Sequence, residues 1–392
     1  MKIAFIVQRY GEDVNGGAEL LCRRIAEHLS RHYCIEVITT CAKDYITWRN
    51  EYSPGKDTVN GITVWRFPVD NPRDIQKFNR FSEKIFGSER RSAEDELEWM
   101  KLQGPYSSEL LSFIKDNKDN YDYFIFFTYL YCTTFFGLPI VREKALLVPT
   151  AHDEPPIYLS IFDVLFKLPL ALIYSTEEEK KFVGSKFKNE KIPSEIIGVG
   201  IDIPEEINAD SFKQKYKVDN YIIYVGRIDE SKGCKELFQY FIRYKKEAQS
   251  NIKLVLLGKP VLKVPEHPDI MPLGFVSEQD KFNGIKAAEL LIMPSKYESL
   301  SMVIMETWLC NNAVLVNGNC EVLKGHCLRS NGGLYYTNYE EFRASLNLLL
   351  MNSQLRTRMG ENGRRYVEEN YGWEKIENKY KELLNNLQHD IE

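Results

Sequence analysis

Short apolar runs alternate with longer amphipathic stretches along most of the chain. The runs are rich in β-branched and aromatic residues and are bounded by polar or turn-forming residues, a pattern that favours buried strands. They cover residues 3–7, 35–39, 124–127, 145–149, 170–174, 221–225, 253–257, 290–293 and 313–316. Strands that alternate with helical stretches are typical of βαβ units, so the chain is predicted to be an α/β protein with parallel sheets.

The runs fall into two groups, which indicates two domains. A polar stretch, Asp202–Asn220, separates the groups and contains several acidic residues and no clear strand. We interpret it as a linker between two Rossmann-like domains, of residues 1–203 and 204–373. The last stretch, Glu374–Gln388, has apolar or aromatic residues at the spacing of one helix face, so it is predicted to be a helix that packs on another part of the protein.

One segment, Tyr123–Val141, carries no charge and approaches the ~20 apolar residues that a membrane helix needs. A membrane span is therefore an alternative interpretation. Three threonines and the interruptions at Gly137 and Pro139 favour instead a strand over Tyr123–Phe127 that is followed by a short buried helix.

A long insertion, residues 71–105, is predicted to be helical and carries a cationic cluster among aromatic and acidic residues. The cluster consists of Arg73, Lys77, Arg80, Lys84, Arg90 and Arg91. Its ordinary explanation is a solvated surface. With Phe78, Phe81 and Phe86 nearby, it would also suit contact with anionic lipid.

The composition excludes several classes of protein. At 392 residues, 44% hydrophobic and 27% charged, the chain matches an ordinary globular protein. Its net charge of −5 gives no general attraction to nucleic acid. Its eight cysteines lack a CxxC pair and are expected to be reduced, as in a cytoplasmic protein. Cys320, His326 and Cys327 lie close together in the sequence but lack the further ligands that a metal site needs. The apolar start of the chain ends at Gln8 without a signal-peptide cleavage site.

Gly16 and Gly17 follow the first run and precede a helical stretch. Paired glycines at this point let backbone amides approach an anion, with the positive end of the helix behind them. A structural turn explains the pair equally well. The spacing is not the GxGxxG of dinucleotide-binding proteins, so NAD is not expected as a cofactor.

Arg227 and Lys232 lie in the loop after the first run of the second domain, where open α/β sheets bind ligands. Together they would neutralise a diphosphate, the arginine by a forked contact and the lysine as a point charge. Taken alone, the two residues are also compatible with ordinary surface cations.

Two carboxylates, Glu298 and Glu306, follow the run at 290–293, one on a loop and one near the start of a helix. Both are expected to face one crevice. Two glutamates at this spacing are common on solvated surfaces. Glu306, however, lies in the apolar stretch 303–308, which is unusual for a solvated carboxylate.

In this order, these elements resemble the retaining glycosyltransferases of the large group 1 family, also numbered family four, which share an E-x7-E element. Glu298 and Glu306 match that element. The supporting segments are 224–227 with 232–233, 273–277, 294–295, 331–335, 359–364 and 371–373. The resemblance covers nearly the whole chain, most closely from Tyr221 to the end. It implies the GT-B fold, in which two Rossmann-like domains face each other across a cleft, and a C-terminal helix, here 374–392, that crosses back to the first domain.

The resemblance also implies roles for the motif residues. Glu306 would hydrogen-bond the ribose of a nucleotide-sugar donor, and Glu298 would contact the donor sugar near the reacting carbon. Arg227 and Lys232 would hold the diphosphate, whose charge grows in the transition state. The full set expected to bind the donor is Gly16, Gly17, Arg227, Lys232, Phe275, Val276, Glu298, Ser299, Leu300, Ser301 and Glu306. At Ser299 and Ser301 the family usually has glycines.

His152 follows the run at 145–149, at the ligand-binding end of the first predicted sheet. In similar enzymes, a histidine in this loop contacts the donor sugar or supports its transition state, and a purely structural role is the alternative. The residues expected to be catalytic are therefore Glu298, His152, Arg227 and Lys232.

Together these features predict a cytoplasmic, retaining hexosyltransferase that needs no metal and no cofactor. It would transfer a sugar from a UDP- or GDP-linked donor to a hydroxyl of a saccharide or lipid-linked saccharide, in the synthesis of cell-surface polysaccharide or glycan. The sequence has no Asp-x-Asp pair for a bridging cation. A lipid-linked acceptor would bring the protein to the inner face of the membrane as a peripheral enzyme, and no nucleic-acid partner is expected.

Two alternatives remain. One is a sugar-nucleotide epimerase or phosphorylase on the same fold, which would act without a separate acceptor. The other is a non-catalytic subunit that binds nucleotide sugar and partners another transferase. The presence of Glu298, Arg227, Lys232 and Glu306 argues against the second.

Overall fold

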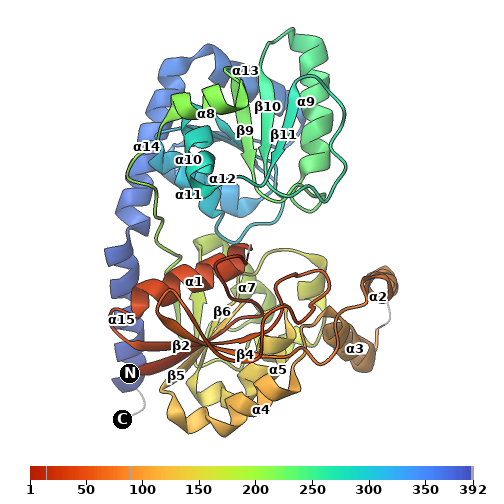
Figure 1. Cartoon of the computed structure of the whole chain (residues 1–392), viewed down its shortest axis with the longest axis vertical. Coiled ribbons are helices and arrows are strands. Elements are labelled where there is room, and N and C mark those ends of the chain that lie inside the picture. Colours follow the sequence, from red (N-terminus) through yellow and green to blue (C-terminus); the bar gives the residue numbers. More distant parts are fainter. Residues whose placement is uncertain (15, 89–90, 390–392) are drawn as a thin grey trace. The chain divides into compact units, whose positions relative to one another are not determined.

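The computed structural model describes residues 1–14, 16–88 and 91–389. Arg90 of the cationic cluster and residues 390–392 of the predicted C-terminal helix lie outside the described residues. The chain divides into two compact units, one of residues 1–200 and 376–392 and one of residues 201–375 (Figure 1). Each unit is built on a largely parallel sheet covered by helices, which confirms the predicted α/β class.

The first unit contains, within the described residues, an eight-stranded sheet in the order β3-β4-β2-β1-β5-β6-β7-β8. Its strands are β1 (Lys2–Ile6), β2 (Cys34–Thr40), β3 (Gly55–Val59), β4 (Ile62–Phe67), β5 (Tyr123–Phe127), β6 (Ala145–Val148), β7 (Ala171–Tyr174) and β8 (Ser194–Ile196). Neighbouring strands are parallel except β3 and β4. The strands β1, β2, β5, β6 and β7 lie where the apolar runs predicted them.

The antiparallel hairpin of β3 and β4 was not predicted. Its turn is Asn60-Gly61, where both residues have positive φ, 49° and 79°. This is the usual turn chemistry of a two-residue hairpin, so the sequence did carry a signal for it. The hydrophobic pattern missed the hairpin because all of β3 except Val59 is exposed.

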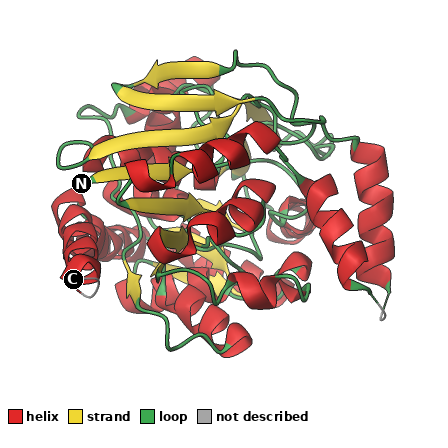
Figure 2. Cartoon of the chain, turned by 90° about the horizontal axis from the view of Figure 1, so that it is seen from below, coloured by secondary structure: helices red, strands yellow, loops and turns green. Residues whose placement is uncertain are grey.

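Helices cover both faces of this sheet (Figure 2). They are α1 (Gly17–Leu29), α2 (Ile75–Gly87), α3 (Ala93–Gln103), α4 (Ser108–Asp116), α5 (Cys132–Gly137), α6 (Phe162–Leu165) and α7 (Glu177–Phe187), with the 3-10 helices η1 (Lys118–Asn120), η2 (Leu138–Lys144) and η3 (Pro155–Tyr158). The uncharged segment Tyr123–Val141 forms β5, α5 and part of η2, so the prediction of a strand followed by a helix is confirmed. None of the described helices is long and apolar enough to span a membrane.

The insertion 71–105 forms α2 and α3, which lie side by side at the edge of the unit (Figures 1 and 2). Part of the surface that was expected to meet lipid is engaged within the protein. The Arg73 guanidinium lies 4.9 Å from the Trp48 ring centre and 4.6 Å from the Phe78 ring centre. Phe78 and Phe86 in turn pack on the Trp99 ring. Arg73 and these two phenylalanines therefore have partners within the protein, and the expected contact with lipid stays a prediction.

The C-terminal helix α15 (Trp373–His389) belongs, from Ile376 onward, to the first unit. The residues whose spacing predicted the helix are buried: Ile376, Tyr380, Leu383, Leu384 and Leu387. Glu377 also binds two histidines at the end of α1, with 3.1 Å from Oε1 to His28 Nδ1 and 2.7 Å from Oε2 to His32 Nε2. The predicted return of the C-terminal helix to the first domain is confirmed.

The second unit contains, within the described residues, a six-stranded sheet in the order β11-β10-β9-β12-β13-β14, with all neighbours parallel. Its strands are β9 (Tyr221–Val225), β10 (Lys253–Leu257), β11 (Ile270–Gly274), β12 (Leu291–Met293), β13 (Val314–Asn317) and β14 (Gly333–Tyr336). The strand order reverses between β9 and β12, and ligands of open α/β sheets bind at the carboxyl ends of the strands at such a point.

The helices of the second unit are α8 (Ala209–Tyr216), α9 (Cys234–Ala248), α10 (Glu278–Ala287), α11 (Met302–Leu309), α12 (Glu321–Ser330), α13 (Tyr339–Met351) and α14 (Ser353–Tyr371). Helix α8 corrects the interpretation of residues 202–220 as only a linker. Its Phe212 is fully buried and packs so closely on Gly284 of α10 that a Cβ there would lie 2.7 Å from the ring. The helix escaped prediction because Phe212 is its only buried residue.

Replacing Gly363 by alanine tests the packing of α14 on α11. A Cβ at Gly363 would lie 2.1 Å from Cδ1 of Trp308, which is fully buried. We expect Gly363→Ala to lower the free energy of unfolding by ~1–3 kcal/mol, measured by urea denaturation. The matched control is Gly184→Ala in α7, where nothing lies within 4 Å of the added Cβ. The control should raise stability by ~0.5–1 kcal/mol, and equal effects of the two substitutions would contradict the packing described.

Candidate functional site

The loop after β9 is organised by the carboxylate of Asp229. It accepts hydrogen bonds from the Ser231 hydroxyl at 2.7 Å and the Lys232 amide at 2.9 Å, and it pairs with the Arg227 guanidinium. Burial alone would raise the pKa of this carboxyl, but these bonds and the arginine charge hold the pKa below its ordinary value. Asp229 therefore holds the Arg227 side chain and the backbone at Lys232.

Gly233 joins this loop to the loop after β12. Its φ is +75°, and a Cβ there would lie 2.2 Å from the carbonyl oxygen of Pro294. Only glycine fits a backbone of this conformation in so close a contact. The same Pro294 carbonyl accepts a hydrogen bond from the Asn317 side chain after β13, at 3.0 Å. The two loops at the switch point are thus locked together.

The contact between these two loops brings two predicted catalytic residues together. Lys232 Nζ lies 2.8 Å from Glu298 Oε1, and it also reaches the carbonyl oxygen of Tyr297 at 3.5 Å. The Glu298 side chain is 14% exposed and that of Lys232 is 32% exposed, so both groups border solvent from a partly buried position. A cation and a carboxylate therefore meet at the carboxyl ends of β9 and β12.

Glu306 lies on α11 with 4% of its surface exposed. Its Oε1 accepts a hydrogen bond from Lys281 Nζ on α10, at 2.9 Å. A buried carboxylate without a partner would be strongly unfavourable, so this lysine explains how a glutamate is tolerated among apolar side chains. Lys281 was not predicted, because its partner is on another helix and no sequence spacing links the two.

Ser301 occupies the position just before α11 and has the left-handed conformation, φ 65° and ψ 71°. Its side chain is 93% buried, and its hydroxyl has no hydrogen-bond partner among the described residues. The side chain does not cap the helix, and in the first turn the Ile304 N–H bonds to the Ser301 carbonyl oxygen at 3.2 Å. The helix therefore presents uncapped amides and an unpaired hydroxyl beside the loop that carries Glu298.

The other predicted donor-binding residues of this unit differ in exposure. Phe275 follows β11 and is 72% exposed, and its neighbour Val276 is half-buried. Ser299 is half-buried, whereas the Leu300 side chain is only 4% exposed. Leu300 is therefore almost entirely enclosed.

In the first unit, Gly16 lies against a buried ion pair at the end of β1. Glu19 binds Arg9 Nε at 2.9 Å and the Gln8 side chain at 2.8 Å, and both charged residues are at most 6% exposed. A Cβ on Gly16 would lie 2.0 Å from Glu19 Oε2, whereas a Cβ on Gly17 would meet nothing within 4 Å. Gly16 is thus required for packing, and Gly17 borders open space.

His152 lies in the loop after β6, which leaves the strand through Thr150 at φ +47°. The ring Nδ1 is 3.3 Å from Glu154 Oε1. The same Glu154 oxygen accepts a hydrogen bond from the Tyr129 hydroxyl at 3.0 Å. His152 and Gly16 both lie at the carboxyl edge of the first sheet, after β6 and β1, which are separated by β5.

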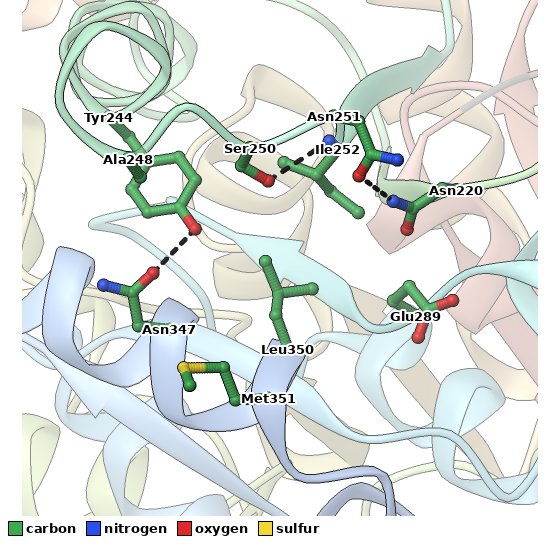
Figure 3. Close-up of a pocket in the computed structure, with 10 residues that line it drawn as sticks. All are labelled: Asn220, Tyr244, Ala248, Ser250, Asn251, Ile252, Glu289, Asn347, Leu350 and Met351. Carbon is green, nitrogen blue, oxygen red and sulfur yellow. Dashed lines mark hydrogen bonds between the residues drawn. The ribbon is translucent and has the colours of Figure 1, made fainter.

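A hollow of about 440 Å³ lies at the opposite, amino-terminal edge of the second sheet (Figure 3). It is lined by Asn220, Tyr244, Ala248, Ser250, Asn251, Ile252, Glu289, Asn347, Leu350 and Met351. Its polar side chains pair with one another, the Tyr244 hydroxyl with Asn347 at 2.7 Å and the Asn220 amide with Asn251 at 2.6 Å. It contains none of the predicted site residues and is at the wrong end of the sheet for a ligand of this fold.

Metal-ligating side chains are not clustered in the part of the chain that the structure describes. Within residues 1–14, 16–88 and 91–389, no group of three or more His, Cys, Asp or Glu is placed to hold a metal ion. This includes Cys320, His326 and Cys327, which are all buried.

Comparison with known proteins relates this geometry to a family. Residues 206–366 match the model of the family described as glycosyl transferases group 1. An uncharacterized glycosyltransferase of Methanocaldococcus jannaschii is 26% identical over 244 residues. The match covers 58% of this chain and 61% of that protein, so it spans less than two thirds of the relative.

Two solved structures resemble the whole chain. Sucrose-phosphate synthase from Thermosynechococcus elongatus superimposes with a TM-score of 0.73 at 14% identity and covers 99% of both chains. HepE of Anabaena, solved in complex with UDP and glucose, superimposes with a TM-score of 0.72 at 15% identity, over 98% of this chain and 100% of that chain. At these identities the likeness establishes the fold, and the predicted GT-B fold is confirmed.

The strained serine gives a prediction for the site. We expect Ser301→Gly to raise the free energy of unfolding by about 1 kcal/mol, because glycine relieves the left-handed strain and removes an unpaired hydroxyl. Denaturation of the neighbouring variant Ser299→Gly is the control, since Ser299 has negative φ and glycine there should cost ~0.4–1 kcal/mol. A loss of stability in Ser301→Gly equal to that in the control would contradict the strain.

Proposed function

We propose that this protein, whose residues 206–366 belong to the glycosyl transferases group 1 family on a GT-B fold, transfers a sugar from a nucleotide-diphosphate sugar to a hydroxyl of a saccharide or lipid-linked saccharide. The observation that carries the proposal is the contact of Lys232 with Glu298 at the switch point of the second sheet. It supports an anionic donor in that crevice, because a partly exposed lysine is available to an anion there.

The leaving group of such a donor is a nucleoside diphosphate, whose negative charge grows as its bond to the sugar breaks. Arg227 and Lys232 would stabilise that charge, and the uncapped amides of α11 would add the positive end of a helix. These groups belong to the protein, so the reaction we propose needs no metal ion. His152, Gly16 and Gly17 would be supplied by the first domain.

Glu306 and Glu298 would take the roles that the resemblance implies for them. Glu306, held by Lys281, would accept hydrogen bonds from the ribose hydroxyls, and Glu298 would contact the sugar beside the reacting carbon. Phe275 and Val276, at the end of β11, would contact the base. HepE was solved with UDP and glucose, so UDP-glucose is the first donor to test.

For the chemical step we propose transfer with retention of configuration. The acceptor oxygen would attack the anomeric carbon on the face from which the diphosphate leaves. The bond from sugar to phosphate oxygen breaks, the bond to the acceptor forms, and the departing phosphate takes the acceptor proton.

We propose that the protein acts in cell-surface glycan synthesis, on a lipid-linked acceptor at the inner membrane face. The exposed side chains of Lys77, Arg80 and Lys84 on α2 would then face anionic lipid. Retention by anionic vesicles at low salt tests this setting.

Substitution of Glu306 tests the donor site. We expect Glu306→Gln to weaken UDP binding ~10-fold or more in calorimetric titration, because hydrogen bonds to a charged acceptor contribute ~1.5–3 kcal/mol. The control is Glu278→Gln, which removes an exposed carboxylate 3.9 Å from the same lysine, Lys281, and should leave binding unchanged. A protein that bound none of UDP, GDP and ADP, or equal losses in both variants, would remove the support for the site.

The stereochemistry of the product tests the mechanism. With UDP-α-glucose and an oligosaccharide acceptor, the anomeric proton of the new linkage should show the small coupling of an α-glycoside by NMR. The initial rate should be unchanged in excess EDTA. A β-linked product would refute retention, and loss of activity in EDTA that Mg²⁺ restores would refute metal independence. Conversion of the donor without any acceptor would favour the epimerase alternative.

A further inference from the structure

Glu179, the third residue of α7, has a carboxylate that is almost entirely enclosed, with 2% of the residue exposed. Both of its oxygens accept hydrogen bonds from backbone amides. Oε1 accepts from the Ala151 N–H at 2.6 Å, and Oε2 accepts from the Ser175 N–H at 2.6 Å. One side chain therefore ties the loop after β6 to the end of β7.

This arrangement differs from ordinary helix capping. Thr176 caps α7 by accepting from the Glu179 N–H at 3.2 Å, as in a capping box. In that motif the glutamate returns to the amide of the cap residue itself. Here it reaches past the cap to Ser175 and across to Ala151, on a different loop. Helix capping alone accounts for neither bond.

Burying a carboxylate is unfavourable in free energy, because the charged group loses its hydration. Burial raises the pKa of the Glu179 carboxyl, and the two amide bonds, which favour its charged form, counteract part of that rise. The bond to Ala151 nevertheless satisfies an N–H that would otherwise be buried without an acceptor, since Ala151 is 1% exposed.

The loop held in this way carries His152. Ala151 precedes His152, and Thr150 before it has the strained φ of +47°, a conformation that persists only where the surroundings enforce it. The His152 ring is approached from another side by Glu154, which Tyr129 orients. The backbone is thus held by Glu179, and Glu154 lies beside the ring.

We infer that Glu179 is a positioning residue for His152, fixing the peptide before it so that the imidazole is presented at the carboxyl edge of the first sheet. The inference rests on the proposed function, in which His152 acts on the donor sugar. Glu179 itself touches no substrate, so its effect must pass through the loop.

The test compares Glu179→Gln with two controls on the same helix turn. A glutamine retains only one acceptor oxygen, so one of the two amides loses its partner. We expect kcat to fall ~10-fold or more with the KM for UDP-sugar within about twofold, because a misplacement on the order of 1 Å can cost ~100-fold in rate. Glu177→Gln removes an exposed charge, and Thr176→Ala removes the cap, and both should retain the parent kcat.

A double variant separates positioning from a general structural role. In a His152→Ala background, Glu179→Gln should cause little further loss of kcat, because the residue through which it acts is absent. An equal fold-loss in both backgrounds would overturn the inference. If Glu179→Gln does not fold, Glu179→Asp, which is one methylene shorter and keeps the charge, takes its place.

Two measurements remain informative even if the protein transfers no sugar. Hydrogen exchange at the Ala151 amide should accelerate at least ~10-fold in Glu179→Gln and stay unchanged in Glu177→Gln. The NMR chemical shifts of the His152 ring protons should change in the first variant only. If hydrogen exchange at Ala151 and the His152 ring signals are unchanged in Glu179→Gln, the positioning role is overturned. If both change but the parent enzyme transfers no sugar, the result counts against the proposed function alone.

Discussion

The candidate site depends on the close contact of Gly233 with the carbonyl of Pro294. It joins the loops that follow β9 and β12, the two strands at the switch point of the second sheet, and leaves no room for a side chain. Because the loops are held together, Lys232 reaches Glu298, while Asp229 binds the Lys232 amide and sets the path of the chain. A parallel sheet provides a crevice at its switch point. The contact at Gly233 brings the charged side chains of Lys232 and Glu298 together there.

The two glutamates of the predicted site each pair with a lysine of the same domain. Lys281 offsets Glu306, which would otherwise be an unpaired buried carboxylate, and Lys232 offsets Glu298. The pair of Lys281 with Glu306 is the more buried, since its side chains are 19% and 5% exposed, against 32% and 14% for Lys232 and Glu298. The buried pair is fixed by its surroundings, whereas a diphosphate would compete with Glu298 for the more exposed lysine, whose flexible stem allows the change of partner.

The strands that the sequence predicted are those buried on both faces, because such strands read as continuous apolar runs. Strand β3 is largely exposed, β11 is interrupted by Pro272 and β14 has a single buried residue, so no apolar run marked them. The residues of the site were likewise predictable only where the local sequence carried a signal. Lys232 and Glu298 were predictable because each belongs to a local motif, and the Asp-x-Ser-Lys turn at 229–232 carried a signal for Asp229. Lys281 and Glu179 were not predictable, because their importance lies in partners on other elements.

The two domains hold their functional groups by different means, and the difference suits different tasks. In the first domain, Glu19 is fixed by Arg9 and Gln8, and Glu179 by two amides, so the carboxylates are bound from several sides in buried positions. The bond from Ala151 to Glu179 restricts the loop that carries His152. In the second domain, the cations that would meet the donor are partly exposed, and each pairs with a carboxylate, Arg227 with Asp229 and Lys232 with Glu298. A rigid edge is needed where a reacting atom must be placed to within a fraction of an ångström, and exchangeable ion pairs are needed where a charged group must enter and leave.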